Sequence, residues 1–147
     1  MIHSHKLQHV YIAGPFFNEE QTNVINDIKK VLKKKKIEFF SPKDKCLYDK
    51  KKDNAEKCFN LNIEALEDCD FMIANIEGFD PGTLFEIGYS YALGRDILAY
   101  SPVKDRKLNL MLAQSCIGIV NSVPELINVL ETYEKTGQIR KYLGEQI

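Results

Sequence analysis

The chain contains 147 residues, of which 44% are hydrophobic and 28% charged, and its net charge is -1. This length fits one domain spanning residues 1–147, and the nearly neutral charge gives no electrostatic basis for nucleic-acid binding. No stretch approaches the roughly 20 apolar residues that cross a membrane. The N-terminus lacks the apolar run of a signal peptide, so we predict a cytoplasmic protein.

The cysteines and histidines do not form a metal-binding pattern. The sequence has no C-x-x-C pair, and its three histidines all fall at the N-terminus, away from the cysteines. We therefore expect no metal site and free thiols in a reducing cytosol. The four cysteines are Cys46, Cys58, Cys69 and Cys116.

The first half of the chain predicts two strands and two helices. Residues 10–13 form a short apolar run, typical of a buried strand, that ends at Gly14. Asn18 is a suitable N-cap for a helix that extends to about residue 35, with apolar side chains at helical spacing. Residues 37–40 predict a second strand. The polar, lysine-rich segment 43–55 predicts a long loop, and residues 55–68 predict a helix with Phe59 on its apolar face.

The second half continues the alternation. Residues 71–74 and 97–100 predict buried strands, joined by a helix that begins near Gly82 and ends at Gly94. A short helix over residues 108–112 precedes a fifth strand at 117–120, and Ser122 caps a helix to about residue 133. Residues 139–147 form a short helix or a tail. This order predicts an α/β protein with a flavodoxin-like or Rossmann-like three-layer fold and a five-stranded, mainly parallel sheet.

In such sheets, ligands bind at the carboxyl ends of the strands, and the first strand ends beside a glycine and two aromatic residues. Gly14 lets the backbone come close to a ligand, and Phe16 or Phe17 can stack on a flat base. A tight turn followed by two core aromatics explains the same residues. This segment alone does not distinguish the two interpretations.

The strongest candidate for chemistry follows the third strand, where Asp80, Gly82 and Glu86 lie in or near the first turn of a helix. The helix dipole and the unpaired N–H groups favour an ionised carboxylate there. An ionised carboxylate at a strand end is what a nucleophile for an anomeric carbon requires. Asp80 can equally be a helix cap and Glu86 an ordinary first-turn acid, so the residues alone leave both roles open. Asn109, after the fourth strand, is uninformative by itself.

Together these segments resemble the nucleoside 2-deoxyribosyltransferase family over about residues 8–130. Residues 11–17, Tyr-Ile-Ala-Gly-Pro-Phe-Phe, are similar to its N-terminal motif. Residues 80–94, Asp-x-Gly-Thr-x-x-Glu-Ile-Gly-Tyr-x-x-Ala-Leu-Gly, are similar to its catalytic motif. Residues 70–75 and 108–111 also match in type and order.

The resemblance implies that Glu86 is the nucleophile, which forms a covalent 2-deoxyribosyl-enzyme as the first base leaves. It also implies that Tyr11 hydrogen-bonds and orients Glu86, and that Asp80 contacts the base and assists proton transfer to its ring nitrogen. A nucleophile and an acid are the groups that breaking a glycosidic bond requires. The implied reaction uses a deoxynucleoside and a free nucleobase and needs neither a cofactor nor a metal.

The resemblance also implies a set of substrate-binding residues. Asn62 stands where many members have an aspartate that binds the sugar hydroxyls. Asn109 and Met111 match residues that a neighbouring subunit contributes to the site, which implies a homo-oligomer. The remaining expected binding positions are Gly14, Phe16 and Gly82.

Two other functions compete with base exchange. The first is hydrolysis of 2-deoxynucleoside 5'-monophosphates, in which water replaces the second base. Asn109 stands where such hydrolases have a phosphate-binding serine, which favours a nucleoside substrate. The lysines of segment 43–55 leave a nucleotide substrate open, although a solvated polar loop also explains them. The second is a non-catalytic nucleotide sensor, because a fold does not fix a function.

Overall fold

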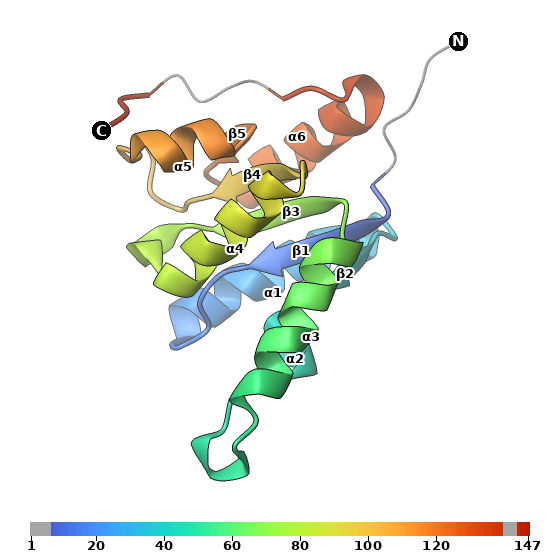
Figure 1. The fold of residues 1–147 in the computed structure, drawn as a ribbon. Coiled ribbons are helices and arrows are strands. Elements are labelled where there is room, and N and C mark those ends of the chain that lie inside the picture. The colour runs from blue at the N-terminus through green and yellow to red at the C-terminus, as the bar shows by residue number, and fades with distance from the viewer. Residues whose placement is uncertain (1–6, 140–143) are drawn as a thin grey trace.

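Five parallel strands form the central sheet, in the order β2-β1-β3-β4-β5 (Figure 1). The computed structural model describes residues 7–139 and 144–147. Within these residues every neighbouring pair of strands is parallel, which confirms the predicted α/β fold and its flavodoxin-like strand order. The strands are β1 (His9–Ala13), β2 (Glu38–Phe40), β3 (Phe71–Asn75), β4 (Asp96–Tyr100) and β5 (Gly118–Val120).

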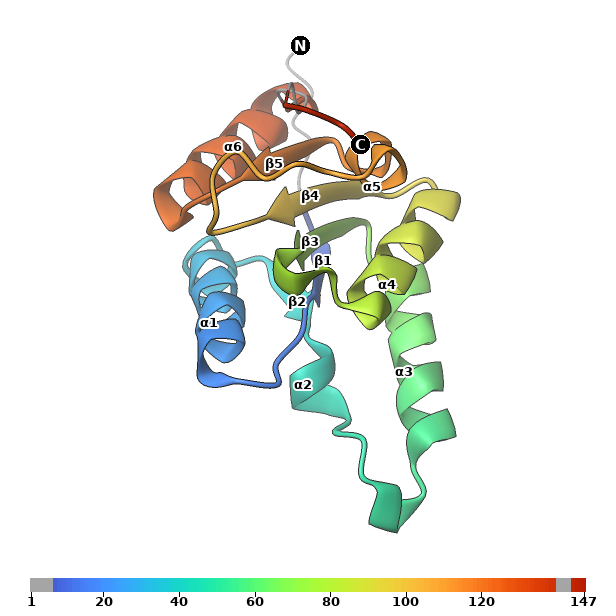
Figure 2. The ribbon, with the colours of Figure 1, turned by 90° about the vertical axis from the view of Figure 1, so that its left-hand side faces the viewer.

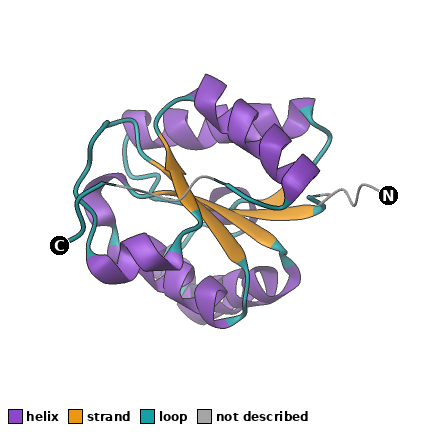
Figure 3. Cartoon of the chain, turned by 90° about the horizontal axis from the view of Figure 1, so that it is seen from above, coloured by secondary structure: helices purple, strands orange, loops and turns teal. Residues whose placement is uncertain are grey.

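Helices cover both faces of this sheet, which gives three layers (Figure 3). One face carries α1 (Glu19–Lys34) and α6 (Val123–Thr136). The other face carries α3 (Ala55–Asp68), α4 (Pro81–Ala92) and α5 (Leu110–Ser115). The short helical segments are α2 (Pro42–Lys45) and the 3-10 turns η1 (Lys50–Lys52) and η2 (Glu77–Phe79).

Alternation along β1 divides the core between the two helix layers. Val10 and Ile12 pack with α1 and α6, whereas Tyr11 and Ala13 pack with α3, α4 and α5. Successive side chains of a strand point to opposite faces, so this register decides which layer Tyr11 faces. The side chain of Tyr11 is therefore directed toward the helix that carries Glu86.

Capping residues define several helix ends as the sequence predicts. The Asn18 side chain accepts a hydrogen bond from the Gln21 amide at 2.8 Å, and Ser122 caps α6. Gly94 follows α4 with a φ of 77°, the left-handed conformation that suits a glycine after a helix. One packing expectation is wrong: Phe59 is 54% exposed, because α3 turns other side chains inward. The buried residues of α3 are Cys58, Ala65 and Leu66.

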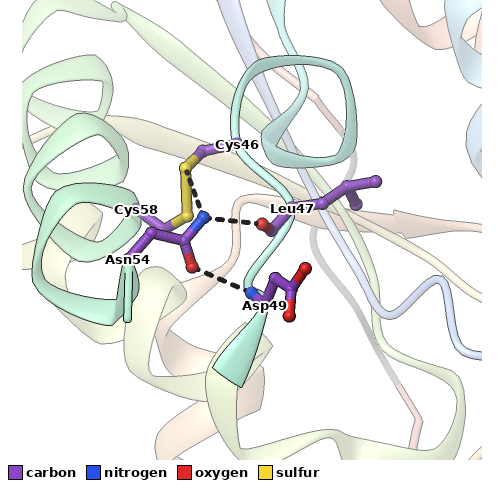
Figure 4. The surroundings of a disulfide bond; sticks show 5 residues. All are labelled: Cys46, Leu47, Asp49, Asn54 and Cys58. Carbon is purple, nitrogen blue, oxygen red and sulfur yellow. Dashed lines mark hydrogen bonds between the residues drawn. A yellow bond between two sulfur atoms is a disulfide. The ribbon is translucent and has the colours of Figure 1, made fainter. Parts of the chain in front are cut away.

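The predicted loop 43–55 contains α2 and η1, and a disulfide ties it to α3 (Figure 4). Figures 1 and 2 show the η1 end of this segment projecting away from the sheet. Cys46 is bonded to Cys58, which lies on the first turn of α3, so the prediction of free thiols is wrong for this pair. The Asn54 side chain braces the same turn, donating to the Leu47 carbonyl at 3.0 Å and accepting from the Asp49 amide at 2.8 Å.

The other two cysteines, Cys69 and Cys116, are free and buried, and burial raises the pKa of each thiol to about 12. Among the described residues, no three metal-binding side chains gather at one place. His3 and His5 lie outside the described residues, as does the 140–143 part of the predicted tail. In the described part of the chain, no helix has the length and apolar character needed to cross a membrane.

Candidate active site

Asp80 is the N-cap of α4 at the carboxyl edge of the sheet. Its Oδ2 accepts hydrogen bonds from the Thr83 amide at 2.9 Å and from the Thr83 hydroxyl at 3.1 Å. A Cβ on Gly82 would stand 3.1 Å from the same oxygen, so glycine leaves room for the cap. The capping role is therefore present. Oδ1 of Asp80 takes part in neither bond, which leaves that oxygen available for a second role.

Glu86 lies one turn further along α4 and is held by a residue of the sheet. The Tyr11 hydroxyl donates a hydrogen bond to Oε2 of Glu86. Tyr11 is buried, and its ring stacks on Phe40 with centroids 5.4 Å apart, which fixes the direction of the hydroxyl. The sequence predicts Glu86 in or near the first turn, but α4 begins at Pro81 and places it in the second.

This position changes the expected ionisation of Glu86. Burial raises the pKa of its carboxyl from 4.5 to about 7, the Tyr11 hydrogen bond lowers the pKa, and the charge of Asp80 raises it. Desolvation is the largest of these influences, so the carboxyl of Glu86 ionises less readily than that of an exposed glutamate. The contribution of Asp80 also shows that the two carboxylates lie close together. Near neutral pH, ionised and protonated Glu86 coexist.

Gly14 and Phe16 follow β1 at the same edge. Gly14 has a φ of 151°, and a Cβ there would stand 3.0 Å from both Asn75 Cβ and Ile25 Cδ1. Glycine is thus needed to pack the end of β1 against the end of β3. Phe16 is partly buried and stacks with Phe17 at 6.0 Å, but Phe17 is 79% exposed, so the two are not both core aromatics.

Asn62 lies on α3, which runs beside α4 (Figure 2). The contact between these helices includes Phe59 and Phe85, whose ring centroids are 6.2 Å apart. Oδ1 of Asn62 is buried and has no hydrogen-bond partner among the described residues. A buried acceptor without a partner costs about 1–3 kcal/mol, so this oxygen is suited to a donor such as a sugar hydroxyl.

Asn109 and Met111 lie on the other flank of α4. Asn109 caps α5, since its Oδ1 accepts from the Met111 amide at 2.8 Å, and Met111 is 74% exposed. Both line an apolar hollow of about 660 Å³ with Leu84 and Tyr91 of α4. Leu84 and Glu86 are two residues apart, about 200° around the helix. Within one chain, the structure therefore brings Tyr11, Asp80 and Glu86 together but does not bring Asn109 and Met111 to them.

Some residues of this edge are missed by sequence reasoning. Asn75, the last residue of β3, is buried, and its Oδ1 accepts from the Glu77 amide at 3.2 Å. A polar residue at the end of an apolar strand is a signal that could have identified it. Glu77 also pairs with Arg106, at 2.5 Å between Oε2 and Nη2. The sequence carries no signal for this pair, because its partners are 29 positions apart, in a 3-10 turn and in a loop.

The family model described as nucleoside 2-deoxyribosyltransferase matches residues 10–128, a range that includes Tyr11, Asp80 and Glu86. The chain belongs to this family. No curated protein sequence matches the chain. The residues that match the nucleoside 2-deoxyribosyltransferase family run from β1 into α6, and they take in all five strands of the sheet.

Solved structures agree with the family. The 2-deoxyribosyltransferase of the psychrotolerant bacterium Bacillus psychrosaccharolyticus is 27% identical, with a TM-score of 0.80 over 92% of this chain and 99% of that chain. The 2-deoxyribosyltransferase from Leishmania mexicana is also 27% identical, with a TM-score of 0.55 over 76% and 73% of the two chains. The CMP N-glycosidase of Clostridium botulinum, at 21% identity and a TM-score of 0.63 over 86% and 100%, shares the fold.

Proposed function

We propose that this protein transfers the 2-deoxyribosyl group between nucleobases through a covalent intermediate on Glu86. The observation that carries the proposal is the hydrogen bond from the buried Tyr11 hydroxyl to Glu86, with Asp80 close by. A carboxylate that is oriented by a neighbour and shielded from water is suited to nucleophilic attack. Family membership and the 2-deoxyribosyltransferase structures support the same reaction.

The proposed reaction has two displacements. Oε1 of Glu86, the oxygen that Tyr11 does not hold, attacks C1' of the sugar, and the C1'–N bond breaks with its electron pair going to the base. Asp80 assists delivery of a proton to the ring nitrogen of the leaving base. A nitrogen of the second base then attacks C1' and gives up its proton with the assistance of Asp80, while the ester to Glu86 breaks and the carboxylate returns. Two inversions give net retention at C1'.

We propose that two further residues bind the substrate. Oδ1 of Asn62 accepts a hydrogen bond from a sugar hydroxyl, which satisfies the oxygen that has no partner in the described residues. Phe16 packs against the base at the carboxyl end of β1. Gly14 and Gly82 are needed for the backbone positions around them, so we expect larger residues there to displace β1 or the Asp80 cap.

We also propose a homo-oligomer in which Asn109 and Met111 complete a neighbour's site. The flank of α4 that faces away from Glu86 carries large exposed apolar side chains, the kind of surface that a second copy covers. Mixing two inactive variants, Glu86→Ala and Asn109→Ala, tests this arrangement. Hybrid oligomers regain activity if Asn109 acts across the interface, because one site then has both intact residues. No recovery in demonstrably mixed oligomers contradicts the arrangement.

Hydrolysis of 2-deoxynucleoside 5'-monophosphates is the alternative. The fold shared with a CMP N-glycosidase is compatible with it, and four lysines, Lys43, Lys45, Lys52 and Lys57, line a hollow of about 630 Å³ that also contains two aspartates. Asn109, in place of a phosphate-binding serine, favours the nucleoside. Incubation of adenine with either deoxyinosine or its 5'-monophosphate separates the two reactions: we expect deoxyadenosine from deoxyinosine, whereas release of hypoxanthine from the monophosphate alone, without deoxyadenosine, contradicts the transferase.

A non-catalytic sensor of nucleotides is tested by the same assay with Glu86→Ala. A sensor binds ligand without turnover, so the wild type then yields no product. Loss of exchange in the variant, with product formed by the wild type, supports the enzyme. Unchanged exchange in Glu86→Ala contradicts the role of Glu86.

A further inference from the structure

Three strand ends are joined by a polar network beside the proposed site. Arg106 contacts Glu77 at two points, with Nη2 2.5 Å from Oε2 and Nε 3.3 Å from Oε1. The Ser101 hydroxyl donates to the same Oε1. The Asn121 side chain donates to the carbonyls of Ser101 at 2.9 Å and Val103 at 3.3 Å. The network thus connects the segments that follow β3, β4 and β5.

The two charged members of this network are substantially shielded from water. The side chains of Arg106 and Glu77 are 32% and 20% exposed, and Ser101 is fully buried. A planar guanidinium matches a carboxylate at two points, and a lysine cannot reproduce this geometry. Replacing Arg106 deprives the Glu77 carboxylate of its guanidinium partner in a poorly hydrated place. The pair is therefore a rigid connection rather than a loose surface contact.

At one end, Arg106 holds the turn that leads to Asp80. In η2, Gly78 has a φ of 78° and Phe79 a φ of 48°, and this left-handed conformation is unfavourable for phenylalanine. The guanidinium carbon of Arg106 lies 5.8 Å from the centroid of the Phe79 ring, within the range of a cation–π contact. Arg106 thus contacts residues on both sides of Gly78, and the next residue is Asp80.

At the other end, Arg106 belongs to the segment that leads to Asn109. Only two residues lie between Arg106 and Asn109, the N-cap of α5. The neighbouring Lys107 pairs with Glu145 at 3.2 Å, and the Leu108 amide donates to the Glu145 carbonyl at 3.3 Å, which fixes the same segment from the other side. One ion pair therefore links the Asp80 turn to the Asn109 segment.

We propose that Glu77 and Arg106 are positioning residues that aim the free oxygen of Asp80 at the leaving base. The inference deepens the proposed function and rests on it. Neither residue touches the substrate. They act on Asp80 through the strained turn at Phe79. If the backbone of Phe79 relaxes, the next residue, Asp80, rotates. Misplacing a catalytic group by about 1 Å can cost about 100-fold in rate.

The leaving group distinguishes positioning of Asp80 from a general loss of structure. The base of deoxyinosine needs a proton as it leaves, whereas the base of N7-methyldeoxyguanosine already carries a positive charge and leaves without one. If Arg106 positions Asp80, Arg106→Gln lowers kcat/KM for deoxyinosine by about 10–100-fold. The same variant lowers kcat/KM for the methylated nucleoside by less than about threefold. Glu77→Gln and Asp80→Asn then show the same pattern.

Two further variants complete the test. Arg106→Lys keeps the charge but loses the two-point contact, so we expect only partial recovery for deoxyinosine. Lys35→Gln is the matched control, because Lys35 pairs with Glu134 at 2.9 Å with similar exposure and joins α1 to α6. We expect unchanged kinetics with both substrates in this control.

The possible results separate this inference from the proposed function. Equal losses for both nucleosides in Arg106→Gln and Glu77→Gln, or no loss in either variant, overturn the positioning role. If the wild type cleaves neither nucleoside, or Glu86→Ala remains fully active, the proposed function itself fails. Thermal unfolding of each variant identifies any that do not fold. If Arg106→Gln does not fold, Arg106→Lys is compared with the wild type on the two nucleosides instead.

Discussion

Replacing Tyr11 with phenylalanine tests how the site controls its nucleophile. The substitution removes the hydroxyl that donates to Glu86 and keeps the ring that stacks on Phe40. Glu86 must be ionised to attack, so kcat/KM in the wild type should fall on the acid side with an apparent pKa of about 7. Because the Tyr11 hydrogen bond lowers the pKa of Glu86, Tyr11→Phe should move this acid limb to higher pH.

The size of the effect follows from the energetics of the site. The rise in the pKa of Glu86 from 4.5 to about 7 corresponds to about 3 kcal/mol against the ionised form, at 1.36 kcal/mol for each pH unit. A hydrogen bond to a charged group contributes about 1.5–3 kcal/mol. Its loss should therefore shift the acid limb upward by about one to two pH units and lower kcat/KM at pH 7 by about 5–50-fold.

The assay is base exchange from deoxyinosine to adenine, with kcat/KM measured from about pH 3.5 to 10. Asp80→Asn provides the opposite shift, because the charge of Asp80 raises the pKa of Glu86. A wild-type acid limb near 4.5, the ordinary pKa of glutamate, would refute the burial argument. A limb that stays in place in Tyr11→Phe would refute the role of the hydrogen bond.

Three other changes have defined outcomes. Glu86→Gln should raise the free energy of unfolding by up to about 3 kcal/mol at pH 8 and little at pH 5. The reason is that the raised pKa of Glu86 makes the folded wild type lose stability as pH rises from 4.5 through about 7. Urea unfolding that shows equal effects of the substitution at both pH values contradicts this. Asn62→Ala should raise KM about fivefold without lowering the melting temperature, because the buried Oδ1 of Asn62 has no hydrogen bond to lose in the described residues. A large drop in melting temperature contradicts the proposal that Asn62 binds the sugar. The Cys46–Cys58 disulfide joins two residues at a sequence separation of 12, and its reduction should lower the free energy of unfolding by up to about 3 kcal/mol. Identical melting curves with and without reductant argue against the bond.

Local signals explain why much of the fold is predictable from sequence. Apolar runs and caps such as Asn18 and Ser122 depend on neighbours a few residues away, and the structure places them as expected. The Asp80 cap is also local. The packing of Phe59 was predicted wrongly, because the spacing of apolar residues does not say which of them the neighbouring layer covers.

The site is less predictable because its properties depend on distant contacts. The residues alone left Glu86 undecided, and the resemblance to a family supplied Tyr11 as its partner, 75 positions away. The pKa of Glu86 is raised mainly by burial, which tertiary packing determines and the neighbouring residues of the helix do not. The Cys46–Cys58 bond likewise depends on how the chain folds back to the start of α3 (Figure 4).

The covalent intermediate is the most direct test of the proposed mechanism. Rapid acid quenching of the protein with deoxyinosine in the absence of a second base, followed by mass spectrometry of its peptides, detects a sugar bound to a side chain. We predict that one 2-deoxyribosyl group is attached to Glu86, that adenine discharges it, and that Glu86→Gln lacks it. Product formation with no sugar on Glu86 at any quench time, or attachment to a different residue, contradicts the mechanism.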